Sequence, residues 1–266
     1  MRKIYISADI EGVCGIADWK ETELTEAQGA PFRAQMTREV AAACEAAAEA
    51  GVDEILVKDA HGSGRSIDAA LLPERVRLMR SWTRDIHVMM SGIDSSFDGA
   101  MFVGYHSGAG TNGNPLAHTM NTDAVEVLVN GEKASEFLIN AYTAASFGVP
   151  ILLLTGDRLI CEEAARLNPR TGTVAVSEGI GNASVSINPR LAVERIRKAA
   201  AEALRGDPAA CRLRLPERFE LSIRFRAHHL AYRGSFYPGA SQAGPNSVAF
   251  SARDWTEALR FMFFVL

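Results

Sequence analysis

Short apolar runs alternate with longer segments of helical periodicity over most of the chain. The runs have the length of buried strands, and the longer segments repeat their apolar residues at helical spacing. This alternation favours an α/β fold built on a largely parallel sheet. The expected strands are residues 3–8, 54–58, 76–80, 100–105, 125–129 and 150–155, and the expected helices are 33–50, 133–148 and 158–167.

The pattern changes in the C-terminal part of the chain. Asn188 is a typical N-cap residue, Pro189 suits the first helical turn, and Gly206 is expected to end that helix. The other elements expected here are strands at 219–225 and 246–252 and a final helix whose capping box is Asp254 and Glu257.

The predicted fold class is therefore α/β, with a largely parallel or mixed sheet flanked by helices and a smaller α+β C-terminal portion. The chain has 266 residues, of which 47% are hydrophobic, enough to build the core of one large domain or two small ones. A boundary near residue 157 would separate an α/β domain at 1–157, which carries the candidate site, from an α+β subdomain at 158–266.

Charge and composition narrow the range of partners. The net charge of -4 gives no reason to expect binding to nucleic acid or to an anionic membrane surface. No apolar run approaches the ~18 residues that a membrane span needs. The first residues enter a strand without the apolar region of a signal peptide, so a cytoplasmic location is expected. The four cysteines form no C-x-x-C pair, which disfavours a zinc ribbon or a disulfide framework.

Acidic and histidine side chains follow three of the expected strands. Asp9 and Glu11 end the first, His61 follows the second, and His106 follows the strand at 100–105. In open α/β sheets, ligands bind beyond the carboxyl ends of the strands. Asp9 and Glu11 would point the same way in an extended chain, so each would make ionisation of the other more costly. A divalent cation held by carboxylates and imidazoles would neutralise this repulsion.

Each of these residues also has an ordinary interpretation. An aspartate at a strand end usually forms a turn or caps a helix. Histidines before glycine-rich loops are often loop residues, and the metal-site hypothesis depends on their joint occurrence at three strand ends. Asp59 could be a metal ligand, a partner that orients His61, or a turn residue, and the second role is favoured. The remaining histidines, His87, His228 and His229, are interpreted as structural.

Five separated segments are similar to a known family. The segments occur in the same order and spacing as those of the DppA-type D-aminopeptidases, a family of dinuclear zinc peptidases, and the similarity covers nearly the whole chain. The segments are SADIEG at 7–12, KDAHG at 58–62, GYHSGAG at 104–110, AHTMN at 117–121 and SEFLINAY at 135–142.

The resemblance implies a role for each matching residue. It implies two Zn²⁺ per subunit and a homodecamer whose active sites face an internal channel. It also implies a catalytic role for His118, which would otherwise be an ordinary loop histidine. Similarly, without the resemblance the only role expected of Glu136 would be to complement the dipole of the helix that begins there. Asn140 lies one turn further along this helix and could support Glu136. The zinc ligands that the resemblance implies are Asp9, Glu11, His61, His106 and Glu136.

The function expected from these features is zinc-dependent removal of N-terminal amino acids, with D-residues favoured, from short peptides. A metal-activated water would attack the peptide bond with His118 assisting, as nucleophile or as acid and base. One alternative is a dinuclear-metal phosphoesterase, although Lys58 is the only basic residue in the ligand segments, where Arg or Lys is usual. A non-enzymatic metal-binding module is the other. The loop at 107–117 differs from the family's usual form, which leaves D or L specificity open.

Overall fold

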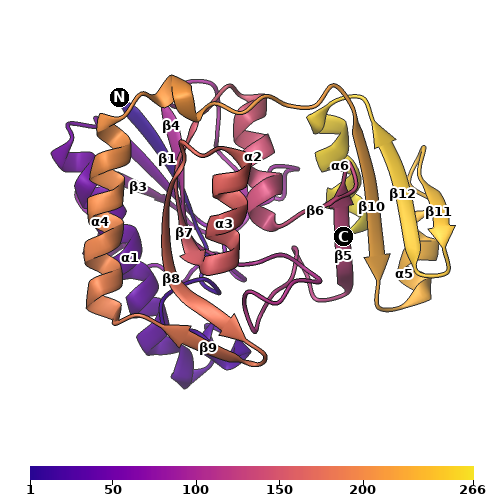
Figure 1. The fold of residues 1–266 in the computed structure, drawn as a ribbon, viewed down its shortest axis with the longest axis horizontal. Helices are drawn as coiled ribbons and strands as arrows, with labels where there is room; N and C mark the ends of the chain where they lie inside the picture. Colours follow the sequence, from indigo (N-terminus) through magenta and orange to yellow (C-terminus); the bar gives the residue numbers. More distant parts are fainter.

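The computed structural model describes residues 1–266 and contains two sheets (Figure 1). The larger sheet has seven strands in the order β3-β2-β1-β4-β7-β8-β9, and every neighbouring pair is parallel except the last. Its strands are β1 (Lys3–Ala8), β2 (Glu54–Asp59), β3 (Val76–Met79), β4 (Gly99–Tyr105), β7 (Ile151–Asp157), β8 (Gly172–Ile180) and β9 (Ala183–Ser186).

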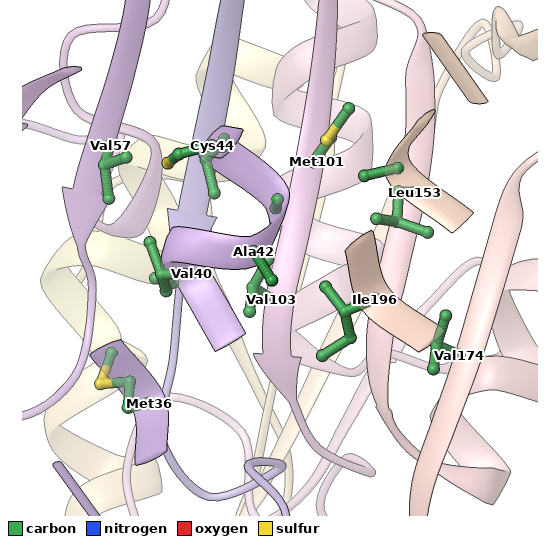
Figure 2. Packing of buried hydrophobic residues seen from close by; sticks show 14 of the residues in the cluster. Met36, Val40, Ala42, Cys44, Val57, Met101, Val103, Leu153, Val174 and Ile196 are labelled. Atoms are coloured by element: carbon green, nitrogen blue, oxygen red, sulfur yellow. The ribbon is translucent and has the colours of Figure 1, made fainter. Parts of the chain in front are cut away.

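Helices cover both faces of this sheet (Figure 1). Helices α1 (Ala30–Glu49) and α4 (Pro189–Arg205) lie on one face, and α2 (Glu136–Ser146) and α3 (Arg158–Leu167) lie on the other. The small alanines of α1 let it pack closely against the sheet and α4. Figure 2 shows this core, in which the labelled residues include Met36, Val40 and Cys44 of α1, Ile196 of α4, and Val57, Met101 and Val103 of the sheet. Burying each larger apolar side chain contributes about 1.5–3 kcal/mol.

The smaller sheet is antiparallel and has five strands in the order β11-β12-β10-β5-β6. Strand β10 alternates buried and more exposed residues, so its inner face packs under the helices α5 and α6. The Trp255 indole of α6 donates a hydrogen bond to Thr143 Oγ1 of α2 at 3.0 Å. This bond links a helix of the smaller sheet to a helix of the larger sheet. These elements are β5 (Ala124–Val129), β6 (Glu132–Lys133), β10 (Phe219–Phe225), β11 (Ser241–Gly244), β12 (Ser247–Ala252), α5 (His228–Gly234) and α6 (Trp255–Val265).

The structure confirms the predicted fold class, with one element misplaced. Helix α2 begins at Glu136 rather than 133, because residues 132–133 pair with β5 and Ser135 caps the helix. The two sheets interleave along the chain: β5 and β6 precede residue 157, whereas α3, β8, β9 and α4 follow it and complete the larger sheet. The expected boundary between 1–157 and 158–266 would therefore divide each sheet instead of separating one sheet from the other. None of the helices combines the length and apolar character that crossing a membrane requires.

The order of the strands brings the candidate residues together. Strand β1 lies between β2 and β4, and Ala8 at its end pairs with Asp59 on one side and Val103 on the other. Because the three strands are parallel, the loops that follow them leave the same edge of the sheet. Helix α2 reaches this edge with its N-terminus, directly after β6 of the smaller sheet.

Candidate metal centre and active site

Six candidate residues from four regions of the chain converge at this edge. They follow β1, follow β2, lie in the loop between β4 and β5, or begin helix α2. Their ligand atoms form two groups, and within each group all the atoms lie within 4.8 Å of one another. The first group is Asp9, Glu11 and His61, and the second is His106, His118 and Glu136.

The first group is centred on the imidazole of His61. Its Nδ1 lies 3.0 Å from Glu11 Oε2 and 3.5 Å from Asp9 Oδ1. Both carboxylates are almost completely buried. Asn114 Nδ2 donates to the backbone oxygen of Glu11 at 3.0 Å, which ties the loop after β4 to the loop after β1.

The second group is centred on the carboxylate of Glu136. Its Oε2 lies 3.4 Å from His106 Nε2, and its Oε1 lies 3.4 Å from His118 Nε2. The backbone N–H of Met120 donates to Oε1 at 2.7 Å. Met120 has a left-handed backbone with φ 65°, which is uncommon for a residue other than glycine. The turn after His118 therefore holds a strained conformation while its N–H contacts this carboxylate.

Asp9 connects the two groups. Its Oδ1 faces His61, and its Oδ2 lies 3.5 Å from His106 Nε2. Both Asp9 Oδ2 and His106 Nε2 are buried without a hydrogen-bond partner. A buried polar atom without a partner costs about 1–3 kcal/mol, and a cation between these atoms would remove that cost. The donor set of carboxylate oxygens and imidazole nitrogens fits zinc.

The electrostatics of these side chains show the same need for a cation. Burial raises the pKa of Asp9 well above its usual value, and the carboxylate of Glu11 raises it further. Burial opposes the charged form of His106, but the carboxylates of Glu136, Asp9 and Glu11 together outweigh it and raise the His106 pKa to about 10. In the same way, the carboxylates of Glu11 and Asp9 together outweigh burial and raise the pKa of His61. Without metal, protons on the histidines thus compensate the crowded acids.

Hydrogen bonds to backbone oxygens fix both histidines of the second group. His106 Nδ1 lies 3.0 Å from the carbonyl of Ser107, and His118 Nδ1 lies 2.8 Å from that of Leu116. Because a carbonyl only accepts, Nδ1 must carry the proton in each ring, which leaves Nε2 with a lone pair in the neutral imidazole. Asp157 supports this arrangement by accepting hydrogen bonds from the N–H and hydroxyl of Ser107 at 2.6 and 2.5 Å.

A pocket of about 500 Å³ opens onto these residues. His106 is absent from its lining, but the other five candidate residues contribute to it. Trp19 packs edge-on against His118, with ring centroids 5.2 Å apart. Arg84 is the only lysine or arginine in the lining.

Some expectations for the surrounding residues are wrong. Asp59 does not hydrogen bond to His61: its Oδ2 accepts from the N–H of Ile67 and so fixes the following loop. Asn140 does not support Glu136, because its amide donates to Tyr105 Oη and Met89 Sδ. His87 and the pair in α5 belong to neither group.

Sequence patterns also missed residues that the fold brings to the site. Trp19, Trp82, Arg84 and Asp157 lie far from the recognised segments along the chain or look like ordinary turn residues there. Only Asp157 carries a signal, because an aspartate at the end of an expected strand and before a helix is a typical N-cap, and it does cap α3.

An α/β sheet with buried carboxylates and imidazoles beyond its strand ends is typical of metal-dependent hydrolases. The model of the D-aminopeptidase family, peptidase family M55, matches residues 1–264, and the chain belongs to this family. It is therefore a metallo-aminopeptidase, a hydrolase of peptide bonds. The resemblance inferred from the five segments is confirmed.

Two comparisons with known proteins agree with this assignment. The D-aminopeptidase of Bacillus subtilis (strain 168) is 30% identical over 262 residues, which cover 98% of this chain and 95% of the relative. The solved structure of the Zn-dependent D-aminopeptidase DppA from Bacillus subtilis, described as a self-compartmentalizing protease, superposes with a TM-score of 0.90. It is 29% identical, and the match covers 99% of this chain and 96% of that one. Neither comparison supports a phosphoesterase or a non-enzymatic module.

Proposed function

We propose that this zinc-dependent aminopeptidase removes N-terminal D-amino acids from short peptides and uses two Zn²⁺ per subunit. The observation that carries the proposal is the connection of two donor groups through Asp9, whose two oxygens face His61 and His106. The zinc dependence of the structural neighbour and the D-aminopeptidase activity of the curated relative support it.

Five side chains would hold the metal ions. Glu11 and His61 would serve one ion, His106 and Glu136 the other, and Asp9 would contact both. Zinc at such a site supplies a Lewis acid that polarises a peptide carbonyl and makes water more acidic. Every donor except His61 has a side chain no more than 5% exposed, so the ions would lie at the base of the pocket rather than at the surface.

His118 would move the proton that peptide hydrolysis requires. Its Nδ1–H is fixed by the carbonyl of Leu116, so the neutral ring offers Nε2 as the base. That nitrogen lies near Glu136 Oε1, which would orient it and stabilise the protonated ring. The same Nε2–H can then donate its proton to the leaving amine. Trp19 packs against the ring and limits its motion.

The oligomeric assembly and the cellular location of the enzyme are a further part of the proposal. The self-compartmentalizing neighbour supports a homo-oligomer, and we propose the decamer that the family resemblance implies. We also propose a cytoplasmic location, which the four free and buried cysteines support, because disulfides are rare in reducing compartments. The substrate would be a short peptide that can enter an enclosed assembly.

A panel of peptides tests the activity directly. D-Ala and L-Ala dipeptides, matching tripeptides and an N-blocked control would be incubated with zinc and after chelation, with a phosphomonoester alongside. We expect zinc-dependent release of free amino acid from the free-amine peptides only, and faster release from the D-peptides. Equal rates for D- and L-peptides would contradict the stereospecificity. Phosphate release without peptide cleavage would contradict the aminopeptidase function.

A further inference from the structure

A second, apolar cavity lies beside the metal pocket. It has a volume of about 300 Å³ and lies between helix α2, helix α6 and the segment at 86–88. This volume is far larger than a single water needs and is within the range of small ligand sites. Most of its lining is apolar, including Ile86, Ile139, Leu259, Met262 and Leu266.

The cavity shares a wall with the metal pocket. Val88, Met120 and Asn121 line both spaces, so only these residues lie between the apolar cavity and the metal-binding residues. Met120 also contacts Glu136 through its N–H. A group that occupies the cavity would thus lie one residue away from the site of hydrolysis.

The backbone of this wall is strained. Val88 has φ 48° and Met120 has φ 65°, both in the left-handed region. A β-branched residue such as Val88 is rare there, and each such residue costs roughly 1–3 kcal/mol. Strain of this kind often accompanies binding sites, and here both strained residues lie where the two spaces meet.

Three polar residues line the cavity, and the amides of two of them, Asn121 and Asn140, are already engaged; the third is His87. Asn121 Nδ2 donates to the carbonyl of Leu266 at 2.9 Å, and its Oδ1 accepts from the N–H groups of Asp123 and Ala124. Asn140 donates to Tyr105 Oη. A water needs two to four polar partners, and few are free here, so the cavity favours an apolar occupant.

The two spaces differ in the character of their linings. The metal pocket is lined by acids and histidines, and its mouth includes the exposed residues Trp19, Glu23 and Arg84, whereas the apolar cavity extends from Phe263 at the surface to the buried residues Ile139 and Leu259. A peptide bound to an aminopeptidase ends at its N-terminal residue, and the remainder must leave through the open side. The apolar cavity beside the metal pocket therefore suits the side chain of the N-terminal residue.

Building on the proposed function, we propose that this cavity is the specificity pocket for the N-terminal residue and accepts large apolar side chains. Val88 and Met120 form its entrance, and Leu259 and Leu266 limit its depth. The enzyme should then cleave peptides that begin with leucine at least as well as those that begin with alanine.

Filling the cavity tests this proposal. Leu259→Phe and Leu266→Trp would each reduce the space, and Phe264→Trp is the matched control, because Phe264 is 65% exposed on the same helix and does not line the cavity. For each protein, kcat/KM would be measured on D-leucyl-glycine and D-alanyl-glycine. Zinc content, thermal unfolding and product inhibition by free D-leucine and D-alanine would accompany the rates.

We expect both filling variants to lower the ratio of D-leucyl to D-alanyl cleavage about tenfold and to weaken inhibition by D-leucine. Zinc content and the control should be unchanged. Leu266 is only half-buried, so its variant carries the test if Leu259→Phe fails to fold. The proposed specificity pocket would be overturned if the filled variants kept the wild-type ratio of D-leucyl to D-alanyl cleavage. It would also be overturned if the wild-type enzyme cleaved only the D-alanyl peptide. Failure to cleave any peptide would instead reject the proposed function.

Discussion

His118 stacks on His106, with ring centroids 4.4 Å apart and ring planes inclined by 13°. The inner ring of His106 is completely buried, whereas the side chain of His118 is 12% exposed and lines the pocket. Both Nε2 atoms face the same carboxylate, but only the outer ring can meet a substrate. The stacked pair thus separates a histidine suited to metal binding from one suited to proton transfer.

Replacing His118 by alanine should therefore remove activity and leave the metal in place. Loss of a general acid or base typically lowers kcat by about 10²–10⁴-fold. Zinc per chain, measured by atomic emission, should match the wild type. His229→Ala is the control, because that histidine lies in α5 and outside both groups. Full activity of the His118→Ala protein with bound zinc would exclude the catalytic role.

Asp9 should matter for both metal ions, because its two oxygens face different histidines. We expect Asp9→Asn to lower zinc binding at both positions, since the amide retains the shape but loses the charge between the groups. His61→Ala should affect only the group that contains it. Zinc titrations with a chromophoric chelator would compare the two variants. Equal loss in both would contradict the connecting position of Asp9.

Zinc binding should release protons. The pKa of His106 is raised to about 10, so this ring holds a proton at pH 7 before zinc binds, and the neighbouring carboxylates also raise the pKa of His61. Zinc binds the neutral imidazole, so each proton must leave and zinc affinity should rise with pH. Calorimetric titrations in buffers of different ionisation enthalpy would count the protons. His118→Ala, which retains both rings, should release the same number, and heats that do not depend on the buffer would refute the idea.

Much of the larger sheet could be predicted because its signals are local. The run that ends at Asp9 and the alanine-rich helix before Gly51 carry their own periodicity and end signals. Strand β8 was missed, because it has mixed exposure and pairs with β7 on one side and β9 on the other. The assignment of β5 to the smaller sheet depends on pairing with β10, about ninety residues later along the chain. No local pattern encodes such a partner.

The candidate site likewise contains residues that local sequence patterns predict and residues that they do not. Three strand ends identified Asp9, Glu11, His61 and His106 from residue type and position alone. Glu136 and His118 required the family resemblance, because a helix N-terminus and a loop explain such residues equally well. The shared wall of Val88 and Met120 could not be foreseen, since it depends on left-handed backbone at two residues that ordinarily avoid it.

Gly104 controls how closely the loops after β1 and β4 approach. Its φ is +74°, and a Cβ atom there would lie 2.4 Å from the backbone oxygen of Asp9 and 2.8 Å from the side chain of Val13. Gly104→Ala must therefore displace the backbone that carries Asp9. We expect lower zinc content and a loss of stability well beyond the about 1–2 kcal/mol of left-handed strain.

Gly131→Ala provides the matched control for Gly104→Ala. Its φ is +83°, but a Cβ atom there would meet nothing within 4 Å. This variant should therefore show the backbone strain without the clash, and it should bind zinc like the wild type. Urea unfolding and zinc content of both proteins would separate the two effects. If the two variants lose equal stability and both retain zinc, close contact at Gly104 does not position Asp9, and the geometry of the site must depend on the hydrogen bonds around it.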